Sequence, residues 1–151
     1  MLLLLVTLVT WLPDRGAPQG TDWQVVIRRA ADDEVLFTAP VAAEDLLVFH
    51  WVHSVEHFRW QETIAVTEEG SLMLLESRFE GYGAGIPHEN PGGVRIEDGW
   101  VIFENMNREL DGYDWLHSHT ALPEITRNNE AFLQGTELPH HQSLRMTIEE
   151  R

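Results

Sequence analysis

The chain has 151 residues, of which 43% are hydrophobic and 23% are charged, a composition typical of one globular domain. It has no cysteine and its ten basic residues are all arginine, which excludes disulfides, thiolate metal sites, a cysteine nucleophile and lysine Schiff-base chemistry. Against these stand 25 acidic residues and a formal net charge of -15, which argues against nucleic acid and anionic lipid surfaces as partners.

The N-terminal residues 1–12 form an almost wholly apolar run that ends at Pro13. The run is shorter than the roughly twenty apolar residues that span a bilayer. We therefore predict a signal peptide or short membrane anchor over residues 1–20, and a single β domain over residues 21–151. This arrangement predicts a periplasmic or otherwise extracytoplasmic protein that contacts the membrane only through its N-terminal segment.

Beyond residue 20 the chain consists of short β-type runs separated by turn signals, and no amphipathic helix is evident. We predict strands at residues 23–29, 34–38, 46–52, 60–67, 72–79, 94–97, 100–104, 115–120, 121–126, 131–133 and 143–148. Asp98-Gly99 is a two-residue hairpin signal, and residues 86–93 read as a loop. The predicted fold class is all-β: a small antiparallel β-sandwich or a partly open barrel.

Alternation along residues 60–67 sets the register with the next predicted strand, residues 72–79. A two-residue turn at Glu69-Gly70 places apolar residues opposite apolar ones along one face. The exception on that face is Glu62, which faces Ser77.

The strand upstream can be folded back in the same way, around a loop centred on residues 57–58. This register pairs Phe49 with Val66 and leaves His53 opposite Glu62. A buried carboxylate is costly unless it is paired, so Glu62 should bond to a neighbour.

The predicted polar cluster lies beside a glycine-rich segment whose backbone N–H groups can bind an anion. The candidate binding residues are His53, Glu56, Glu62, Ser77, Gly81, Gly83 and Gly85. The alternative interpretation is a structural His–Glu pair at the end of a sheet, next to a tight glycine turn. No catalytic residue is assigned.

Other histidines invite comparison with metal sites. Residues 53–57 match His-x-x-Glu-His, a zinc-protease signature that requires a helix, yet the flanking sequence is β-like. His117 and His119 share one strand face at a spacing that suits a metal, although a polar strand face is the simpler interpretation. His140 and His141 follow a proline in a loop and are expected to be solvated.

The motifs described above resemble a bacterial family known as domain of unknown function 1850. The resemblance is carried by His-Ser-Val-Glu at 53–56, by Glu62, by Arg78-Phe79, and by Gly-Ala-Gly-Ile-Pro at 83–87. Residues 57–60 depart from the family pattern, which commonly has a Thr-Pro-containing stretch there. Members resemble small exported β proteins, often encoded beside membrane subunits of TAXI-type tripartite (TRAP) transporters. The resemblance implies a transporter membrane subunit or a solute-binding protein as partner.

The leading hypothesis is thus a non-enzymatic binding or accessory module that needs no cofactor. A small hydrolase is the alternative, with His53 as base near Ser77 or with a metal. A third hypothesis is a divalent-cation sensor built from Glu56, Glu62 and histidines.

Overall fold

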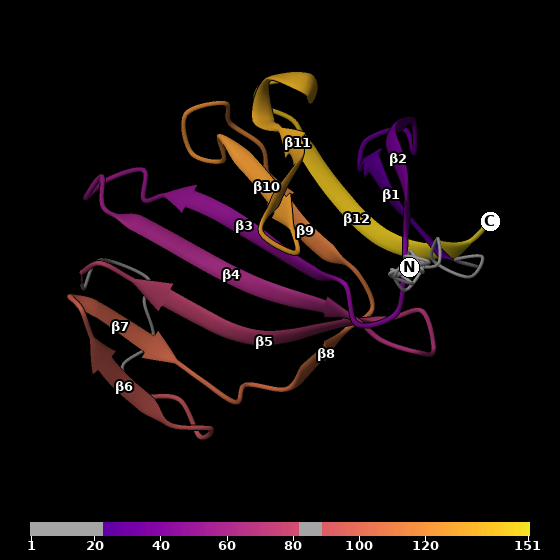
Figure 1. Ribbon diagram of the computed structural model, residues 1–151. Coiled ribbons are helices and arrows are strands. Elements are labelled where there is room, and N and C mark those ends of the chain that lie inside the picture. Colours follow the sequence, from indigo (N-terminus) through magenta and orange to yellow (C-terminus); the bar gives the residue numbers. More distant parts are fainter. Residues whose placement is uncertain (1–22, 82–88) are drawn as a thin grey trace, which may run out of the picture.

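The computed structural model describes residues 23–81 and 89–151, and in these ranges the chain forms strands and one short 3-10 helix, η1 (Gly135–Glu137), but no α-helix (Figure 1). The all-β prediction is therefore confirmed. All strand pairs are antiparallel, and the strands form two separate sheets rather than a closed barrel.

The smaller sheet has the order β2 (Val35–Val41), β1 (Trp23–Arg29), β12 (Ser143–Glu150) and β9 (Tyr113–Leu116). The larger sheet has the order β11 (Glu130–Gln134), β10 (Glu124–Arg127), β3 (Leu46–Val52), β4 (Arg59–Val66), β5 (Leu72–Phe79), β7 (Trp100–Phe103) and β6 (Val94–Glu97). A further strand, β8 (Arg108–Leu110), pairs with the first residues of β5. The sequence analysis missed β8, and its predicted strand 115–120 corresponds to β9, which ends at Leu116.

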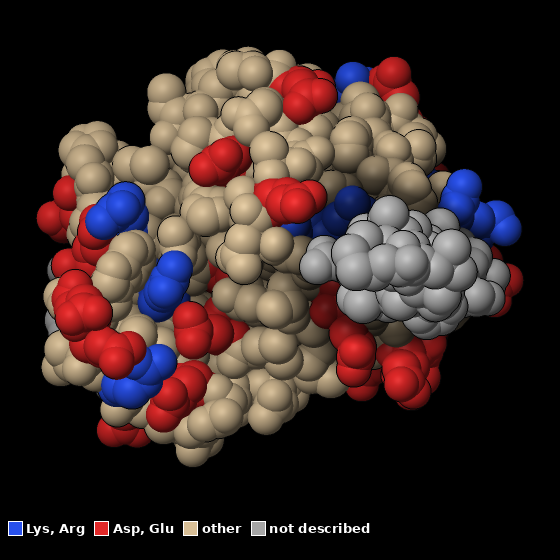
Figure 2. All heavy atoms as spheres, viewed as in Figure 1, with Lys and Arg blue, Asp and Glu red and all other residues tan. Residues whose placement is uncertain are grey.

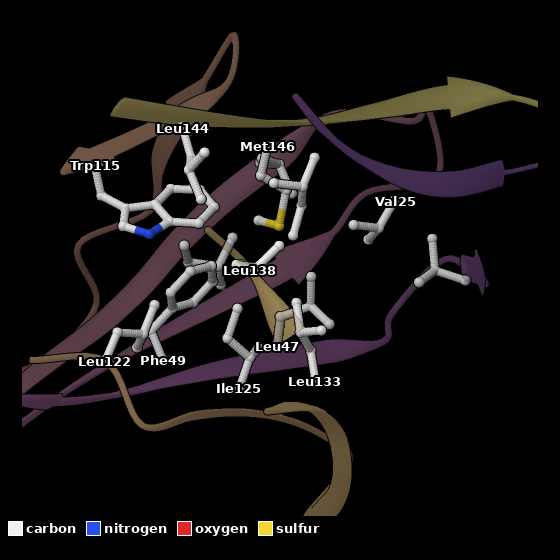
Figure 3. Packing of buried hydrophobic residues seen from close by; sticks show 14 of the residues in the cluster. Val25, Leu47, Phe49, Trp115, Leu122, Ile125, Leu133, Leu138, Leu144 and Met146 are labelled. Atoms are coloured by element: carbon white, nitrogen blue, oxygen red, sulfur yellow. The ribbon is translucent and has the colours of Figure 1, made fainter. Parts of the chain in front are cut away.

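The two sheets bury one apolar core between them (Figure 3). Val25, Leu144 and Met146 from the smaller sheet pack against residues such as Leu47 and Phe49 from the larger one, and all five are at most 1% exposed. Alternation explains this burial, because every second side chain of a strand points to the same face of its sheet.

The turn between β4 and β5 differs from the predicted Glu69-Gly70 turn. It spans residues 68–70, and the Thr67 N–H closes it by donating to the Ser71 carbonyl at 2.9 Å. Gly70 has φ of +75°, a conformation that glycine adopts without steric cost.

The longer turn shifts the first pairs of the hairpin by one residue, so Val66 pairs with Leu72 instead of Met73. A β-bulge in β5, where Leu75 is the extra residue opposite Thr63 and Ile64 of β4, then restores the predicted register. Glu62 consequently faces Ser77, as predicted.

The predicted pairing of His53 with Glu62 is wrong. Phe49 occupies the position opposite Glu62, and His53 lies beyond the end of β3, where its N–H donates to the Phe58 carbonyl at 2.9 Å. The difference is a slip of four residues, which keeps every side chain on its predicted face. At about 3.3 Å per residue, His53 lies roughly 13 Å along the sheet from the predicted place.

The predicted N-terminal segment, residues 1–20, lies outside the described residues. Among the residues that the structure describes, no helix is long and apolar enough to cross a membrane. Acidic side chains are spread over the visible face of the molecule, with several basic ones beside them (Figure 2).

Candidate functional site

A buried carboxylate lies between the two sheets. Glu62 on β4 is 8% exposed, and its cross-strand neighbour Ser77 on β5 is 4% exposed. The Tyr113 hydroxyl on β9 donates a hydrogen bond to Glu62 Oε2. Because β9 belongs to the smaller sheet, this bond connects the two layers of the sandwich.

Aromatic rings surround this carboxylate. The Phe49 ring, opposite Glu62 on β3, lies 4.7 Å from the Tyr113 ring, 5.8 Å from the Trp115 ring and 6.1 Å from the Trp51 ring between centroids. Aromatic pairs at such separations contribute about 0.5–1.5 kcal/mol beyond their buried area. The site is therefore a rigid aromatic interior with one acid in it.

Two indole N–H groups in this interior have no acceptor within residues 23–81 and 89–151. Trp51 and Trp60 stack with centroids 5.7 Å apart, and both Nε1 atoms are buried with no hydrogen-bond partner among the described residues. The Trp51 indole lies close enough to Glu62 to favour its charged form, but it does not reach hydrogen-bonding geometry. A buried donor without an acceptor costs about 1–3 kcal/mol. These two N–H groups can therefore accommodate an acceptor atom of a ligand.

Burial dominates the electrostatics of the site and raises the pKa of Glu62 above its ordinary value. The Tyr113 hydroxyl, the Trp51 indole, the charge of Arg108 and the Ser77 hydroxyl act in the opposite direction. Burial, together with the nearby Glu62 charge, raises the pKa of Tyr113 as well, so this hydroxyl keeps its proton and remains a donor.

His53 and Glu56 do not join this site. They belong to the turn between β3 and β4, where the His53 Nδ1 accepts the Glu56 N–H at 3.1 Å and the His53 ring stacks on Phe58 at 4.8 Å. The Glu56 side chain is exposed. The His-x-x-Glu-His segment is thus a turn rather than the helix that zinc-protease chemistry requires.

Of the three candidate glycines, Gly81 is half-buried just after β5 and lies against Phe58, whose ring would be 3.3 Å from an added Cβ. Gly83 and Gly85 lie outside the described residues. The proposed anion-binding loop therefore remains a prediction.

His117 and His119 are engaged in structural hydrogen bonds. His117 is fully buried: its Nδ1 accepts the Trp115 indole N–H at 3.2 Å, so its Nε2 carries the proton and donates to the Gly135 carbonyl at 2.8 Å. His119 Nε2 bonds to the Leu138 carbonyl at 2.9 Å. Across residues 23–81 and 89–151, no three His, Asp or Glu side chains are grouped to hold a metal ion.

The sequence analysis did not identify Tyr113, the hydrogen-bond partner of Glu62. A signal was present, because Tyr113 and Trp115 alternate after the turn residues Asp111-Gly112, which is a pattern of a half-buried strand. Alternation indicates which face a residue occupies but not which strand of the other sheet it meets.

Comparison with family models shows a match over residues 47–133 to the family described as domain of unknown function (DUF1850). These residues run from β3 to β11 and include the Glu62 site. No curated protein and no solved structure matches the chain.

Proposed function

This chain belongs to the DUF1850 family, and we propose that it is a non-enzymatic binding module that acts outside the cytoplasm as an accessory of a TAXI-type tripartite transporter. The observation that carries the binding role is the combination of a buried carboxylate, an aromatic interior and two indole N–H donors that find no acceptor in the described part of the chain. Such convergent polar groups in apolar surroundings are typical of small-molecule sites.

The chemistry of these groups defines the ligand. Glu62 accepts a hydrogen bond when ionised, and the Trp51 and Trp60 indoles can only donate. A small polar molecule with both a donor and an acceptor would match them. Aromatic rings also favour a ligand that carries a positive charge.

The hydrolase alternative is weaker. It needs His53 beside Ser77, and the β3–β4 register separates them. Ser77 is buried opposite Glu62 in the middle of a sheet, away from the exposed turn where a nucleophile is accessible.

The extracytoplasmic location and the transporter partner rest on the apolar residues 1–12 and on the family resemblance. The location can be tested by fusing a reporter that is active only in the cytoplasm after Arg151. We expect an intact but inactive fusion, and an active one would contradict the location.

The binding role can be tested by crosslinking the chain in its native membrane to the transporter membrane subunit and to the solute-binding protein. We expect one of them to be captured, and we expect Glu62→Gln to abolish capture without lowering the melting temperature. Glu76→Gln is the matched control, because Glu76 is half-exposed on the adjacent strand. Capture by neither component contradicts the partnership, and capture unchanged in Glu62→Gln contradicts the role of the site.

A further inference from the structure

The opposite face of the larger sheet carries a second row of polar side chains. Glu124, His50, Gln61 and Arg78 are direct cross-strand partners on β10, β3, β4 and β5. Gln61 directly precedes Glu62, so this row lies on the other side of the sheet from the buried carboxylate.

Hydrogen bonds along this row run in one direction. Arg78 Nε can only donate, and it donates to Gln61 Oε1 at 2.5 Å. The amide nitrogen of Gln61 therefore donates to His50 Nδ1 at 3.0 Å, and His50 Nε2 donates to the Thr126 hydroxyl at 3.0 Å. Each hydrogen bond determines the donor and acceptor of the next one. The series of bonds from Thr126 through His50 to Gln61 therefore holds the guanidinium of Arg78 in place.

The neutral form of His50 is required for this chain, because its Nδ1 must accept a hydrogen bond. Burial lowers the pKa of His50, and the positive charge of Arg78 acts in the same direction, while Glu124 opposes them. The row is thus preorganised around neutral pH.

Arg78 is held in position, and the part of the chain that the structure describes gives it no ionic partner. No ion pair within residues 23–81 and 89–151 includes it, although the protein has 25 acidic residues. Its guanidinium lies 5.0 Å from the centroid of the Trp100 ring, which Arg59 also approaches at 5.3 Å. Arg59 is neutralised by Glu80, so the charge of Arg78 is the uncompensated one.

Only the Nε of this guanidinium is used by the described residues, which leaves the two terminal nitrogens for a ligand. The fork of two parallel N–H donors matches a carboxylate. Beside it lies a hollow of about 230 Å³ whose lining includes His50, Arg59, Trp60, Gln61, Pro123 and Glu124. Gln61 therefore contacts both the guanidinium and the hollow.

We propose that Arg78 binds the carboxylate of a small organic acid, with Trp100 beneath its guanidinium, Gln61 as the positioning residue and the neighbouring hollow receiving the rest of the molecule. A hollow of this volume accommodates the remainder of a small organic acid. The proposal concerns the outward face of the sheet, whereas the Glu62 carboxyl group points inward; Trp60, which lines the hollow, also belongs to the aromatic interior, and the two proposals are tested by different variants.

Succinate is a suitable probe, and the fluorescence of Trp100 together with calorimetry reports its binding to the full chain. We expect saturable binding that Arg78→Gln weakens by about tenfold or more, which is the loss of a charge-assisted hydrogen bond. Arg78→Lys keeps the charge without the fork and should also bind more weakly. Gln61→Leu should weaken binding by less than Arg78→Gln, with circular dichroism showing that each variant is folded.

Arg127→Gln is the matched control, because Arg127 lies over the Phe132 ring at 5.1 Å on the same sheet but donates to the Pro40 carbonyl. We expect it to bind succinate as the unmodified chain does. The proposal is overturned if the unmodified chain shows no saturable binding, if Arg78→Gln binds equally well, or if the uncharged succinamide binds as tightly as succinate.

Discussion

Gln61 and Glu62 are neighbours on β4, yet they belong to two different environments. Glu62 points into the core, where its partners are a buried hydroxyl and aromatic rings. Gln61 points outward into a half-buried row that ends in Arg78. Inside, burial outweighs the groups that favour the charged form and raises the pKa of the carboxyl group. Outside, hydrogen bonds orient a charge without removing it from solvent.

One sheet thus separates two chemical environments by a single residue of β4. A one-residue slip of β4 would exchange the two sets of side chains, so the same apolar packing that stabilises the fold also protects both sites. The inner face should therefore dominate stability and the outer face should affect it little.

The strongest test compares Phe49→Ala with His50→Ala on β3. Phe49 is fully buried, so its truncation should cost about 3–5 kcal/mol, whereas His50 is half-buried and its removal should cost about 1 kcal/mol or less. Urea denaturation of both variants measures the difference. If Phe49→Ala does not fold, Phe49→Leu should still lose more free energy of unfolding than His50→Ala, although less than Phe49→Ala would. Equal losses of unfolding free energy at positions 49 and 50 would contradict the expected difference between the two faces.

A finer test removes one hydroxyl from each face. Tyr113→Phe deletes the donor to Glu62 and should cost about 1–3 kcal/mol, because a buried carboxylate loses a partner. Thr126→Val deletes the hydroxyl that bonds to His50 on the outer face and should cost less, since water can replace it. If Thr126→Val lost more free energy of unfolding than Tyr113→Phe, the outer face rather than the inner one would dominate stability.

The pH dependence of stability should also distinguish a buried carboxyl group from exposed ones. The folded-state pKa of Glu62 is raised, so its protonated form stabilises the fold at low pH, and this stability is lost as the pH rises from about 4.5 through the folded-state pKa. Glu62→Gln should remove that loss. Comparing denaturation of the two proteins between acid and neutral pH measures it, and an identical pH profile would show that Glu62 is not shifted by burial.

Some features of the fold and of the candidate site are determined by local sequence, and these could be predicted; others depend on contacts between distant segments. The strands at residues 23–29, 46–52, 72–79 and 94–97 were predicted to the residue, because local alternation and turn residues define them. The predicted Glu62–Ser77 pair is correct although the predicted two-residue turn is not. The extra residue in the turn and the extra residue in the β-bulge offset each other, so the register at Glu62 is unchanged.

The His53 pairing failed for a reason that alternation cannot reveal. A slip of four residues preserves the face of every side chain, so the apolar pattern accepts both registers. The choice is made by the turn itself, in which the His53 Nδ1 accepts the Glu56 N–H and the His53 ring stacks on Phe58. Contacts between sheets, such as that of Tyr113 with Glu62, depend on three-dimensional packing and leave no local signature.

The smallest effect is expected at the surface, for Glu149 on β12. Its carboxylate pairs with Arg28 of β1, with one contact of 3.1 Å between Arg28 Nη2 and Glu149 Oε2, and this hydrogen bond holds the pKa of Glu149 below its ordinary value. A lowered carboxyl pKa stabilises the fold above the ordinary pKa and is lost on acidification, the opposite sign to Glu62. Because both side chains are partly solvated, Glu149→Gln should cost at most about 1 kcal/mol near neutral pH, and less in high salt. Glu150→Gln, which changes the same charge at the adjacent exposed position, is the control. A loss at Glu149 as large as that of Tyr113→Phe, or one that salt does not reduce, would mean that this surface pair behaves like a buried one.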